Sequence, residues 1–579
     1  MKRSIAVCLL LSLLSCSASA APVPPFKAAV VQFNPALNER DKNIEALAAA
    51  FETGMKNGAK LLVAPEMSTT GYHYDDRDAI APFVDTIPGK ATEAFSKLTA
   101  EYDAYVVFGM AEVDRKTGLY YNSSALVGPE GVIGSYRKTH QWEAEEHWSV
   151  FGDLGVPVFG TKLGRIAINI CMDAAYPEAA RLAALSGANI MAFPTNSTSQ
   201  AIAALPARAM QNGLYILSAN RSNTEKSFHM IGGSAIWSPD GECLASTPLG
   251  MTVSDDVHET RFAYADIDPA KYSNRGKDLL AFRRPSLYKD LMLHVGPWNY
   301  AKTTEPKELT ALLVQFQPGE SRAANVKKMQ HLIDEVLSTG GSGKPDLIVL
   351  PELAVNGAAR ADGKKDADFF SDLAKARRAY VVGSFVEKEG KSWYITAALF
   401  DRDGNEVGRY RKTHLSKGER AWAAAGDQIK AFKTDVGIIG VMLGDEVWYP
   451  EIFGILSVYR ADVIAVPSSW KRSDGGQMVL PKEISANKYP DGGMALWDSV
   501  AMSAQAYTLI ANYTGEDYFG GSGIYTLDPL YGLDQPTYLQ REEKALLVKF
   551  RTVQPEWWFN QEMLINSRRT PYYMPLITE

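Results

Sequence analysis

The sequence predicts an α/β protein that consists of two tandem copies of one domain. Short, continuous apolar runs alternate with longer stretches of helical periodicity along the chain. Val/Ile/Leu-rich runs joined by helices are typical of sheets whose two faces are both covered. At 579 residues the chain is also too long for one ordinary core, so two or more domains are expected.

The first copy shows this alternation most clearly. We predict strands at 28–33, 61–66 and 104–110, which are short apolar runs, and helices at 43–57 and 91–102, which are longer periodic segments. Strand order cannot be derived from the pattern alone. In α/β proteins the chemistry gathers at strand ends, so residues at those positions are the candidates for function.

Five segments of the first half recur in the same order in the second half. The pairs are AAVVQFNP (28–35) with ALLVQFQP (311–318), AKLLVAPEMSTTG (59–71) with PDLIVLPELAVNG (345–357), SYRKTHQWEAEEHW (135–148) with RYRKTHLSKGERAW (409–422), GGSAIW (232–237) with GGSGIY (520–525), and RRPSLY (283–288) with RRTPYY (568–573). The offset between copies drifts, which indicates loop insertions, the largest near 471–493. We place the linker at 298–308 and the domains at 24–298 and 308–579.

Composition excludes several classes of protein. Hydrophobic residues make up 46% and charged residues 22% of the chain, the balance of a soluble globular protein. The net charge is -7, and Lys and Arg form no block longer than a pair. The chain therefore carries no electrostatic footprint for nucleic acid, and a small-molecule partner is expected.

The first twenty residues have the features of a secretory signal peptide. A basic start precedes an apolar run at 5–14 and small residues at 18–20. That run is too short to span a bilayer. We therefore expect a secreted or periplasmic protein that has lost residues 1–20. The segment LLSC (13–16) also resembles a bacterial lipobox, which would make Cys16 a lipid anchor of a membrane-attached lipoprotein. With so few cysteines after export, a disulfide framework is not expected.

Three residues that could act together lie at the ends of predicted strands. Glu66 ends the run LLVAPE, Lys138 follows GVIGSYR, and Cys171 ends RIAINIC. A thiol needs a base or a positive neighbour to become a nucleophile, and the other two side chains supply these. Each residue alone has a structural explanation, so the set carries the inference. We also expect the helix-like run after Cys171 to lower the thiol pKa.

The segments around these residues resemble the nitrilase superfamily, also called the carbon-nitrogen hydrolases. APEMSTTGY (64–72), YRKTHQW (136–142) and NICMDAAYPE (169–178) match its three motifs in order. The resemblance covers about 26–293 and implies two tandem nitrilase-like α-β-β-α sandwich domains. It implies that Cys171 is the nucleophile, that Glu66 is the general base, and that Lys138 with the Met172 N–H binds the oxyanion. It implies no metal or organic cofactor.

The same resemblance implies a second glutamate shortly after the lysine. Glu145 and Glu146 both fit, and we choose Glu145 because the repeat pairs it with Glu419. The tryptophans Trp148 and Trp422 then also fall in register.

The second copy keeps only part of this set. Glu352 and Lys412 match Glu66 and Lys138, but Gly444 falls opposite Cys171. Arg208 likewise falls opposite Val500. Because glycine offers no nucleophile, we expect the second domain to be catalytically inactive. An active copy fused to a degenerate one is loosely similar to the arrangement of the vanin and biotinidase family.

The expected activity is that of a secreted amidase-type hydrolase. It would cleave a linear amide or carbamoyl C–N bond through a thioester acyl-enzyme, with pocket walls on loops 72–85 and 196–205. Nitrilases of the superfamily tend to follow the cysteine with Trp-Glu, whereas this chain has Met172-Asp173, which favours an amidase. The alternatives are a nitrilase acting on a nitrile and a non-catalytic amide-binding protein. Superfamily members usually pair as homodimers, so the duplication predicts a monomer with intramolecular domain pairing.

Overall fold

The computed structural model describes residues 23–198, 200–293, 307–339, 343–356, 363–475, 494–526, 536–552 and 557–579. The predicted signal peptide at 1–20, including Cys16, lies outside the described residues. Most of the predicted linker at 298–308 and of the predicted insertion at 471–493 lies outside them as well.

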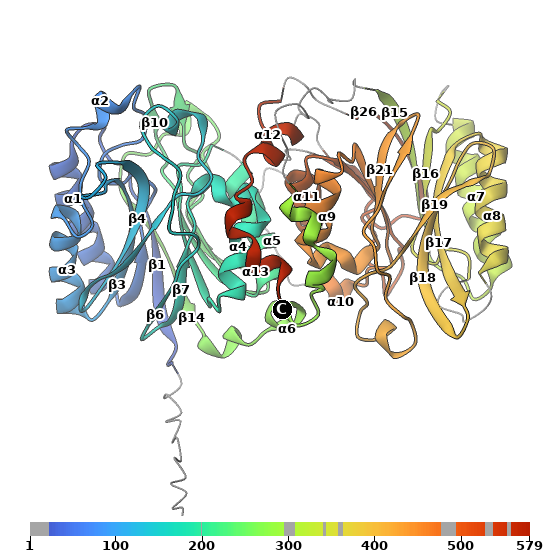
Figure 1. Ribbon diagram of the computed structural model, residues 1–579, viewed down its shortest axis with the longest axis horizontal. Helices are drawn as coiled ribbons and strands as arrows, with labels where there is room; N and C mark the ends of the chain where they lie inside the picture. Colours follow the sequence, from blue (N-terminus) through green and yellow to red (C-terminus); the bar gives the residue numbers. More distant parts are fainter. Residues whose placement is uncertain are drawn as a thin grey trace, which may run out of the picture.

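The first copy contains two six-stranded sheets that pack face to face (Figure 1). The first sheet has the order β14 (Arg261–Ile267), β1 (Phe26–Gln32), β2 (Ala59–Val63), β3 (Tyr105–Val113), β4 (Tyr120–Gly128) and β5 (Gly131–Arg137). The second has the order β13 (Cys243–Ser246), β12 (Ala235–Trp237), β9 (Tyr215–Ala219), β8 (Ile190–Pro194), β7 (Gly164–Ile168) and β6 (Val158–Thr161). The central strands β1, β2 and β3 are parallel, as are β7, β8 and β9.

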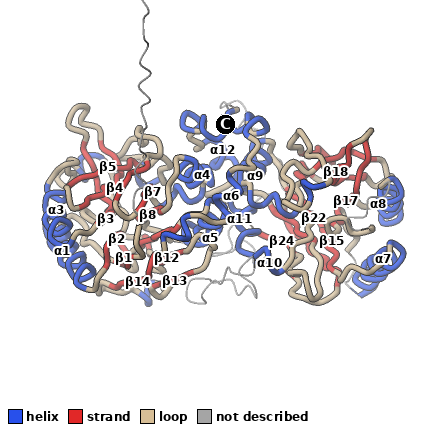
Figure 2. The backbone as a smooth tube through the Cα atoms, turned by 90° about the horizontal axis from the view of Figure 1, so that it is seen from below, coloured by secondary structure: helices blue, strands red, loops and turns tan. Residues whose placement is uncertain are grey.

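Helices cover the outer face of each sheet and complete an α-β-β-α sandwich. Helices α1 (Arg40–Lys56) and α3 (Lys90–Tyr102) cover the first sheet, and α4 (Pro177–Leu185) and α5 (Gln200–Asn212) cover the second (Figure 2). A separate apolar cluster fills the space between the sheets. The β2–β3 and β7–β8 connections therefore position the loops at one end of the sandwich, where the candidate residues lie.

The second copy repeats this architecture. Its first sheet has the order β19 (Glu406–Arg411), β18 (Ser392–Phe400), β17 (Tyr380–Glu389), β16 (Leu347–Val349), β15 (Glu308–Gln315) and β26 (Lys544–Arg551). Its second sheet has the order β20 (Ala431–Thr434), β21 (Gly437–Val441), β22 (Val463–Pro467), β23 (Tyr507–Ala511), β24 (Gly523–Tyr525) and β25 (Thr537–Tyr538). The covering helices are α7 (Arg322–Thr339), α8 (Lys364–Arg377), α9 (Pro450–Val458) and α11 (Met494–Ala504).

The remaining elements are short. They include the β10–β11 pair (Thr224–Glu225 and Phe228–His229) and the helices α2 (Arg77–Ile80), α6 (Arg275–Leu280), α10 (Arg472–Gly475), α12 (Gln561–Asn566) and α13 (Met574–Ile577). None of the helices in the described ranges combines the length and the apolar character that a bilayer crossing requires.

The predicted elements of the first copy are present with shifted ends. The largest difference is at the predicted strand 61–66, because β2 ends at Val63 and Glu66 lies in the turn that follows. Pro65 between them has no N–H to donate to a strand ladder. The helix expected directly after Cys171 is a short 3₁₀ turn, Cys171–Ala175, and α4 begins only at Pro177.

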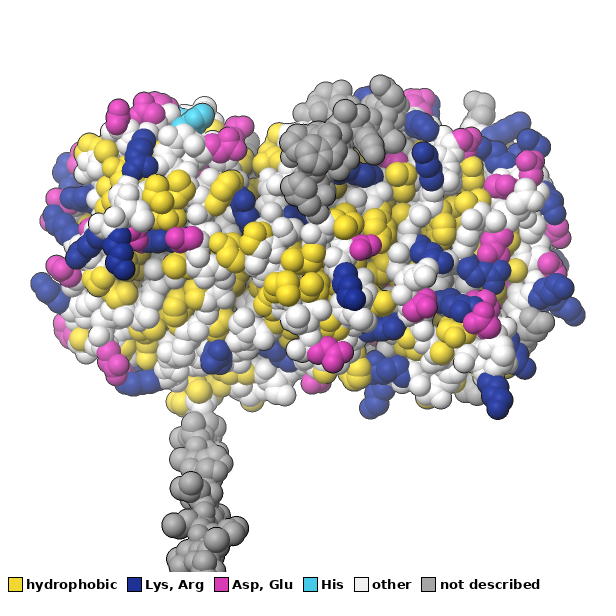
Figure 3. Space-filling model, in the orientation of Figure 1, with side chains coloured by type: hydrophobic (Ala, Val, Ile, Leu, Met, Phe, Trp, Pro, Cys, Tyr) yellow, Lys and Arg dark blue, Asp and Glu magenta, His cyan; other side chains and the backbone are white. Residues whose placement is uncertain are grey.

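The two sandwiches pack through their helical layers, with α4 and α5 facing α9 and α11 (Figure 1). One apolar cluster spans the boundary and includes Leu182 and Leu291 of the first copy with Trp448 and Phe453 of the second. On the face drawn in Figure 3, apolar side chains gather where the halves meet, and charges of both signs are interspersed elsewhere. The interface therefore resembles a protein core more than a loose contact.

A buried ion pair network crosses the same boundary. Glu451 of α9 contacts Arg181 at 3.2 Å and Arg283 at 2.7 Å, and all three side chains are almost fully buried. Each charge therefore depends on its partner in the other copy, since a buried charge left alone is costly.

Candidate active site

The candidate residues of the first copy meet at one end of the sandwich. Lys138 directly follows β5, Glu66 lies in the turn after β2, and Cys171 begins the 3₁₀ turn that follows β7. Glu145 comes from a short 3₁₀ turn, Glu143–Glu145, whereas the neighbouring Glu146 is exposed. The structure thus brings the four residues together from both sheets.

A buried ion cluster forms the base of the site. The Lys138 ammonium donates to Glu66 Oε1 at 2.8 Å and to Glu145 Oε1 at 2.5 Å, and the three side chains are 0% exposed. The Asn122 amide also donates to both carboxylates, at 2.7 and 2.9 Å, and the Tyr72 hydroxyl donates to Glu145 at 3.0 Å. Every member of the cluster is held by at least two charge-assisted or neutral hydrogen bonds.

Asp173 holds the turn that presents Cys171. Its carboxylate accepts hydrogen bonds from the Ile170 N–H at 2.8 Å and from the Tyr136 hydroxyl at 2.7 Å, and it contacts His140 at 2.8 Å. Cys171 itself has a φ of 43°, in the left-handed region that residues other than glycine seldom adopt. Such a conformation costs about 1–3 kcal/mol and persists because the surroundings enforce it.

The Cys171 thiol does not have the lowered pKa that the sequence predicted. Burial and the nearby Glu66 carboxylate raise its pKa to about 12, and Lys138 opposes this only in part. The helix-dipole expectation is wrong because α4 starts six residues later, and such effects fade within one turn. At neutral pH the thiol is therefore protonated, and its attack on a substrate requires a base.

Burial and the neighbouring charges act in opposite directions on the pKa values of Lys138 and Glu145. Burial opposes the charge on Lys138, but Glu145 and Glu66 outweigh it and raise the pKa of the ammonium. Burial also raises the pKa of Glu145 to about 7, with Lys138 acting in the opposite direction. Glu145 thus titrates close to neutral pH.

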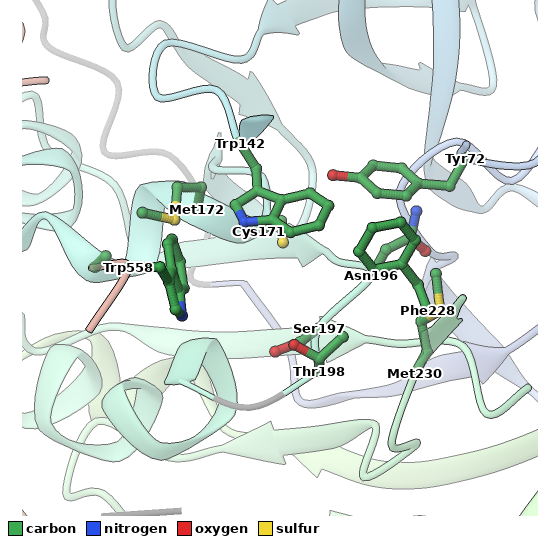
Figure 4. A pocket seen from close by; sticks show the side chains of 11 residues that line it. Tyr72, Trp142, Cys171, Met172, Asn196, Ser197, Thr198, Phe228, Met230 and Trp558 are labelled. Carbon is green, nitrogen blue, oxygen red and sulfur yellow. The ribbon is translucent and has the colours of Figure 1, made fainter. Parts of the chain in front are cut away.

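Cys171 lies in a pocket of about 550 Å³, counting its open mouth (Figure 4). The described lining residues are mostly aromatic or apolar: Tyr72, Trp142, Met172, Ala175, Phe228, Met230 and Trp558, with Asn196, Ser197 and Thr198 as the polar part. Loops 72–85 and 196–205, expected as pocket walls, both contribute. Small-molecule sites typically combine such an apolar and aromatic lining with a few polar groups.

Asn196 is unusual among the lining residues. Its side chain is 5% exposed, yet neither Nδ2 nor Oδ1 has a hydrogen-bond partner in the protein. Its backbone N–H donates to Glu66 Oε2 at 2.9 Å, which fixes it beside the base. A buried amide without partners is costly unless a ligand supplies them.

Sequence reasoning missed Asn122 and Trp558, and it placed Asn196 in a pocket wall without assigning it a role. The repeat held a signal for Asn122, because Ile395 occupies its place in the second copy. The Lys412 N–H donates to the Ile395 carbonyl as the Lys138 N–H donates to that of Asn122, both at 2.8 Å. Nothing in the sequence connects Trp558, in the second copy, with Cys171.

The second copy retains the ion cluster, with Asp445 as an additional member. Lys412 contacts Glu352 at 3.0 Å, Glu419 at 2.7 Å and Asp445 at 3.7 Å. Gly444 stands where the first copy has Cys171, and it lacks a positive φ, so the backbone does not demand glycine there. The described site therefore lacks the thiol of the first copy, and the hydroxyl beside its glutamate is that of Ser469, which donates to Glu352 Oε2 at 2.6 Å.

Two tryptophans fill the space that would serve this second site. The registers of α4 with α9 and of β8 with β22 pair Ala175 with Trp448 and Ser197 with Trp470. A Cβ atom on Gly444 would lie 3.4 Å from Cδ1 of Trp470, which is 1% exposed. The rings of Trp448 and Trp470 stack with their centroids 5.9 Å apart.

No group of three or more possible metal-ligating side chains occurs within the described ranges. Cys243, the other described cysteine, lies on β13, where its Sγ contacts the Ala245 carbonyl oxygen at 3.5 Å. β13 is an edge strand, separated by three strands from β7, the strand that leads to Cys171.

The fold and this cluster define a two-copy α-β-β-α sandwich protein with a cysteine beside a buried Glu-Lys pair in one copy only. The family model for carbon-nitrogen hydrolases matches residues 27–273 and 310–528. The chain therefore belongs to the carbon-nitrogen hydrolase family of the nitrilase superfamily, and it contains two tandem nitrilase-like domains.

Similar proteins include hydrolases of more than one kind. A nitrilase of Pyrococcus abyssi is 38% identical over 221 residues, which are 38% of this chain and 84% of the relative. A formamidase of Bacillus cereus is 32% identical over 235 residues, which are 38% of this chain and 70% of the relative.

Solved structures of the same superfamily are also similar. A carbon-nitrogen hydrolase from Helicobacter pylori covers 47% of this chain and 99% of its own, with 24% identity and a TM-score of 0.42. An amidase from Nesterenkonia covers 44% and 95%, with 22% identity and a TM-score of 0.37.

Proposed function

We propose that the first copy is a cysteine-dependent amidase that hydrolyses a linear amide or carbamoyl C–N bond. The observation that carries this proposal is the buried Glu66–Lys138 pair beside the Cys171 thiol at the base of a small-molecule pocket. A thiol that is protonated at neutral pH needs an adjacent base, and Glu66 is that base.

The reaction proceeds in two halves. Glu66 takes the thiol proton while Cys171 Sγ bonds to the carbonyl carbon, and the oxyanion is held by Lys138 and the Met172 N–H. The C–N bond then breaks, and Glu66 returns the proton to the departing amine, which leaves a thioester on Cys171. Water adds to the thioester as Glu66 takes its proton, and collapse releases the acid and restores the thiol.

Glu145 supports this cycle without touching the substrate. It shares the Lys138 ammonium with Glu66 and so keeps the lysine charged and fixed at its position. It is a positioning residue, and the Asn122 amide that bridges the two carboxylates orients it in turn.

Asn196 supports an amide substrate over a nitrile. The residue lines the pocket, and its buried amide nitrogen and carbonyl oxygen both lack hydrogen-bond partners in the protein. A primary amide or carbamoyl group supplies a complementary acceptor and donor. A nitrile supplies an acceptor only and would leave Asn196 Oδ1 unpaired, at a cost of about 1–3 kcal/mol.

The test is a panel of short amides, carbamoyl compounds and pantetheine-like amides, each paired where possible with its nitrile, with released ammonia or amine measured. Amides should turn over at least tenfold faster than matched nitriles. The variant Asn196→Leu should lose most of this preference. Faster turnover of the nitriles would make the protein a nitrilase, and binding without any release would make it an amide-binding protein.

We also propose that the chain is exported and monomeric, with the second copy taking the place of a partner subunit. The shared apolar cluster and the buried Glu451 network support the pairing. Light scattering tests the oligomeric state. The intact mass of the exported protein distinguishes cleavage after Ala20 from lipid attachment at Cys16.

A further inference from the structure

A side chain of the second copy forms part of the first copy's pocket. Trp558 is one of the residues that line the pocket around Cys171, although it precedes helix α12 of the second sandwich. In Figure 4 it stands on the opposite side of Cys171 from Tyr72 and Phe228. Side chains of both copies therefore line the pocket.

Contacts on both sides fix Trp558 at this position. The adjacent Phe559 is 1% exposed and packs in one cluster with Met172 and Tyr176 of the first copy. Its ring meets that of Tyr176 edge-on, with centroids 6.2 Å apart. Trp558 itself packs against Phe559, with ring centroids 5.4 Å apart.

Helix α12 fastens this segment to the second copy. The Gln561 side chain donates to the carbonyl oxygens of Ala461 at 3.0 Å and Ala504 at 3.1 Å, and Asn560 caps the helix by accepting from the Met563 N–H at 3.0 Å. Trp558 is thus carried by one sandwich and presented to the other. Despite these contacts Trp558 remains 42% exposed, so part of its surface is accessible to a ligand.

The wall opposite Trp558 is also aromatic. Tyr72 stacks on Trp142 with ring centroids 6.2 Å apart, and Phe228 meets Trp142 edge-on at 4.8 Å. None of the described residues that line the pocket is Lys, Arg, Asp or Glu. A charged substituent would lose its hydration here without gaining a partner, whereas a flat apolar group would gain contact on two sides.

We propose that Trp558 is a specificity-determining residue, and that the substrate is an amide bearing an uncharged, aromatic-sized apolar group held between Trp558 and the wall formed by Tyr72, Trp142 and Phe228. This inference rests on the proposed amidase function. It also gives the inactive second copy a role in catalysis, which is to supply one wall of the active pocket.

The test compares phenylacetamide with acetamide, which share the scissile amide and differ in the apolar group. In Trp558→Ala, kcat/KM for phenylacetamide should fall about tenfold or more, mainly through KM. Turnover of acetamide should stay within twofold. Trp558→Phe keeps a flat ring and should restore most of the loss.

Phe282 provides the matched control. It is 43% exposed, lies in the first copy after α6, and contacts the second copy's Arg420, whose guanidinium stands 3.7 Å from the ring centre. Phe282 is thus a first-copy aromatic residue that contacts the second copy, whereas Trp558 is a second-copy aromatic residue in the first copy's pocket. Phe282 does not line the Cys171 pocket. Phe282→Ala should leave the phenylacetamide-to-acetamide ratio unchanged. An equal loss on both amides in Trp558→Ala, or no loss on either, would overturn the inference.

Binding separates this inference from the amidase proposal. If the wild-type protein releases ammonia from neither amide, the amidase proposal fails, and calorimetric titration with phenylacetamide then tests Trp558 directly. Binding should be about tenfold weaker in Trp558→Ala than in the wild type or Phe282→Ala. Undetectable binding to the wild type, or equal binding to all three proteins, would reject the role of Trp558. Thermal unfolding of each variant identifies any that fail to fold.

Discussion

Arg569 of the second copy donates a hydrogen bond from Nε to the carbonyl oxygen of Thr139 in the first copy, at 2.5 Å. Thr139 directly follows Lys138, the lysine of the candidate site. The duplication repeats the contact in reverse, because Arg284 of the first copy donates to the Thr413 carbonyl, next to Lys412, at 3.1 Å. Each copy thus holds the segment that carries the other copy's lysine.

We predict that Arg569→Ala lowers kcat about tenfold with little change in KM. Loss of the donor leaves the Thr139 carbonyl unpaired, at a cost of about 1–3 kcal/mol, and frees the segment that positions Lys138. Arg569→Lys should recover part of the activity. The control is Arg284→Ala, which removes the mirrored contact beside the second site, where Gly444 replaces the cysteine, and it should keep kcat within a fewfold. Equal losses in the two alanine variants would mean that the contact serves stability alone.

Glu66→Gln should lower the turnover rate by about 10²- to 10⁴-fold, the usual effect of removing a proton-transfer group. Glutamine keeps the size of the side chain and can still accept from Asn122, so the fold should survive, as circular dichroism can verify. Glu352→Gln makes the same change in the second copy and should leave the rate within a fewfold of wild type. Comparable damage from both changes would show that the second site is active.

The pH dependence follows from the two carboxyl groups that share Lys138. Burial raises the pKa of Glu145 to about 7, and Glu66 contributes in the same direction. Below this pH Glu145 holds a proton and no longer pairs with the Lys138 ammonium as a carboxylate, so the lysine is less firmly positioned. We therefore expect kcat/KM to rise with pH across an apparent pKa near 7. Glu145→Gln removes the group that titrates and should abolish this rise, and a wild-type profile that stays flat from pH 5 to 9 would contradict the assignment.

Restoring the nucleophile should not restore the second site. In a Cys171→Ala background, we expect Gly444→Cys to show no turnover, because Trp448 and Trp470 occupy the space for substrate and Ile395 replaces Asn122. The measurement is ammonia release from the best substrate of the wild type. Turnover regained by this single substitution would show that only the missing thiol had silenced the copy.

The sequence was enough to predict the two-copy α/β fold and most of the ion cluster. Glu66, Lys138 and Cys171 lie in contiguous motifs at strand ends, and the repeat separated Glu145 from Glu146 by pairing it with Glu419. These features are local in the chain or are repeated in it. Pattern and register are therefore sufficient to find them.

The rest of the site depends on contacts between distant segments. Asn122 faces the carboxylates only because β4 pairs with β5, and Trp558 reaches Cys171 only because the two sandwiches pack together. The direction of the Cys171 pKa shift also could not be predicted from the sequence. It is decided by burial and by the closeness of Glu66, neither of which follows from the position of the next helix.

The most direct test of the proposed chemistry is ammonia release by Cys171→Ala, measured beside Cys243→Ala with the same amide. Cys243 is the other described cysteine and lies at the edge of its sheet, so its replacement should leave the rate close to that of the wild type. Release by Cys171→Ala should fall to the background of the buffer. Ammonia release by Cys171→Ala at a rate comparable to the wild type would contradict the assignment of Cys171 as the nucleophile.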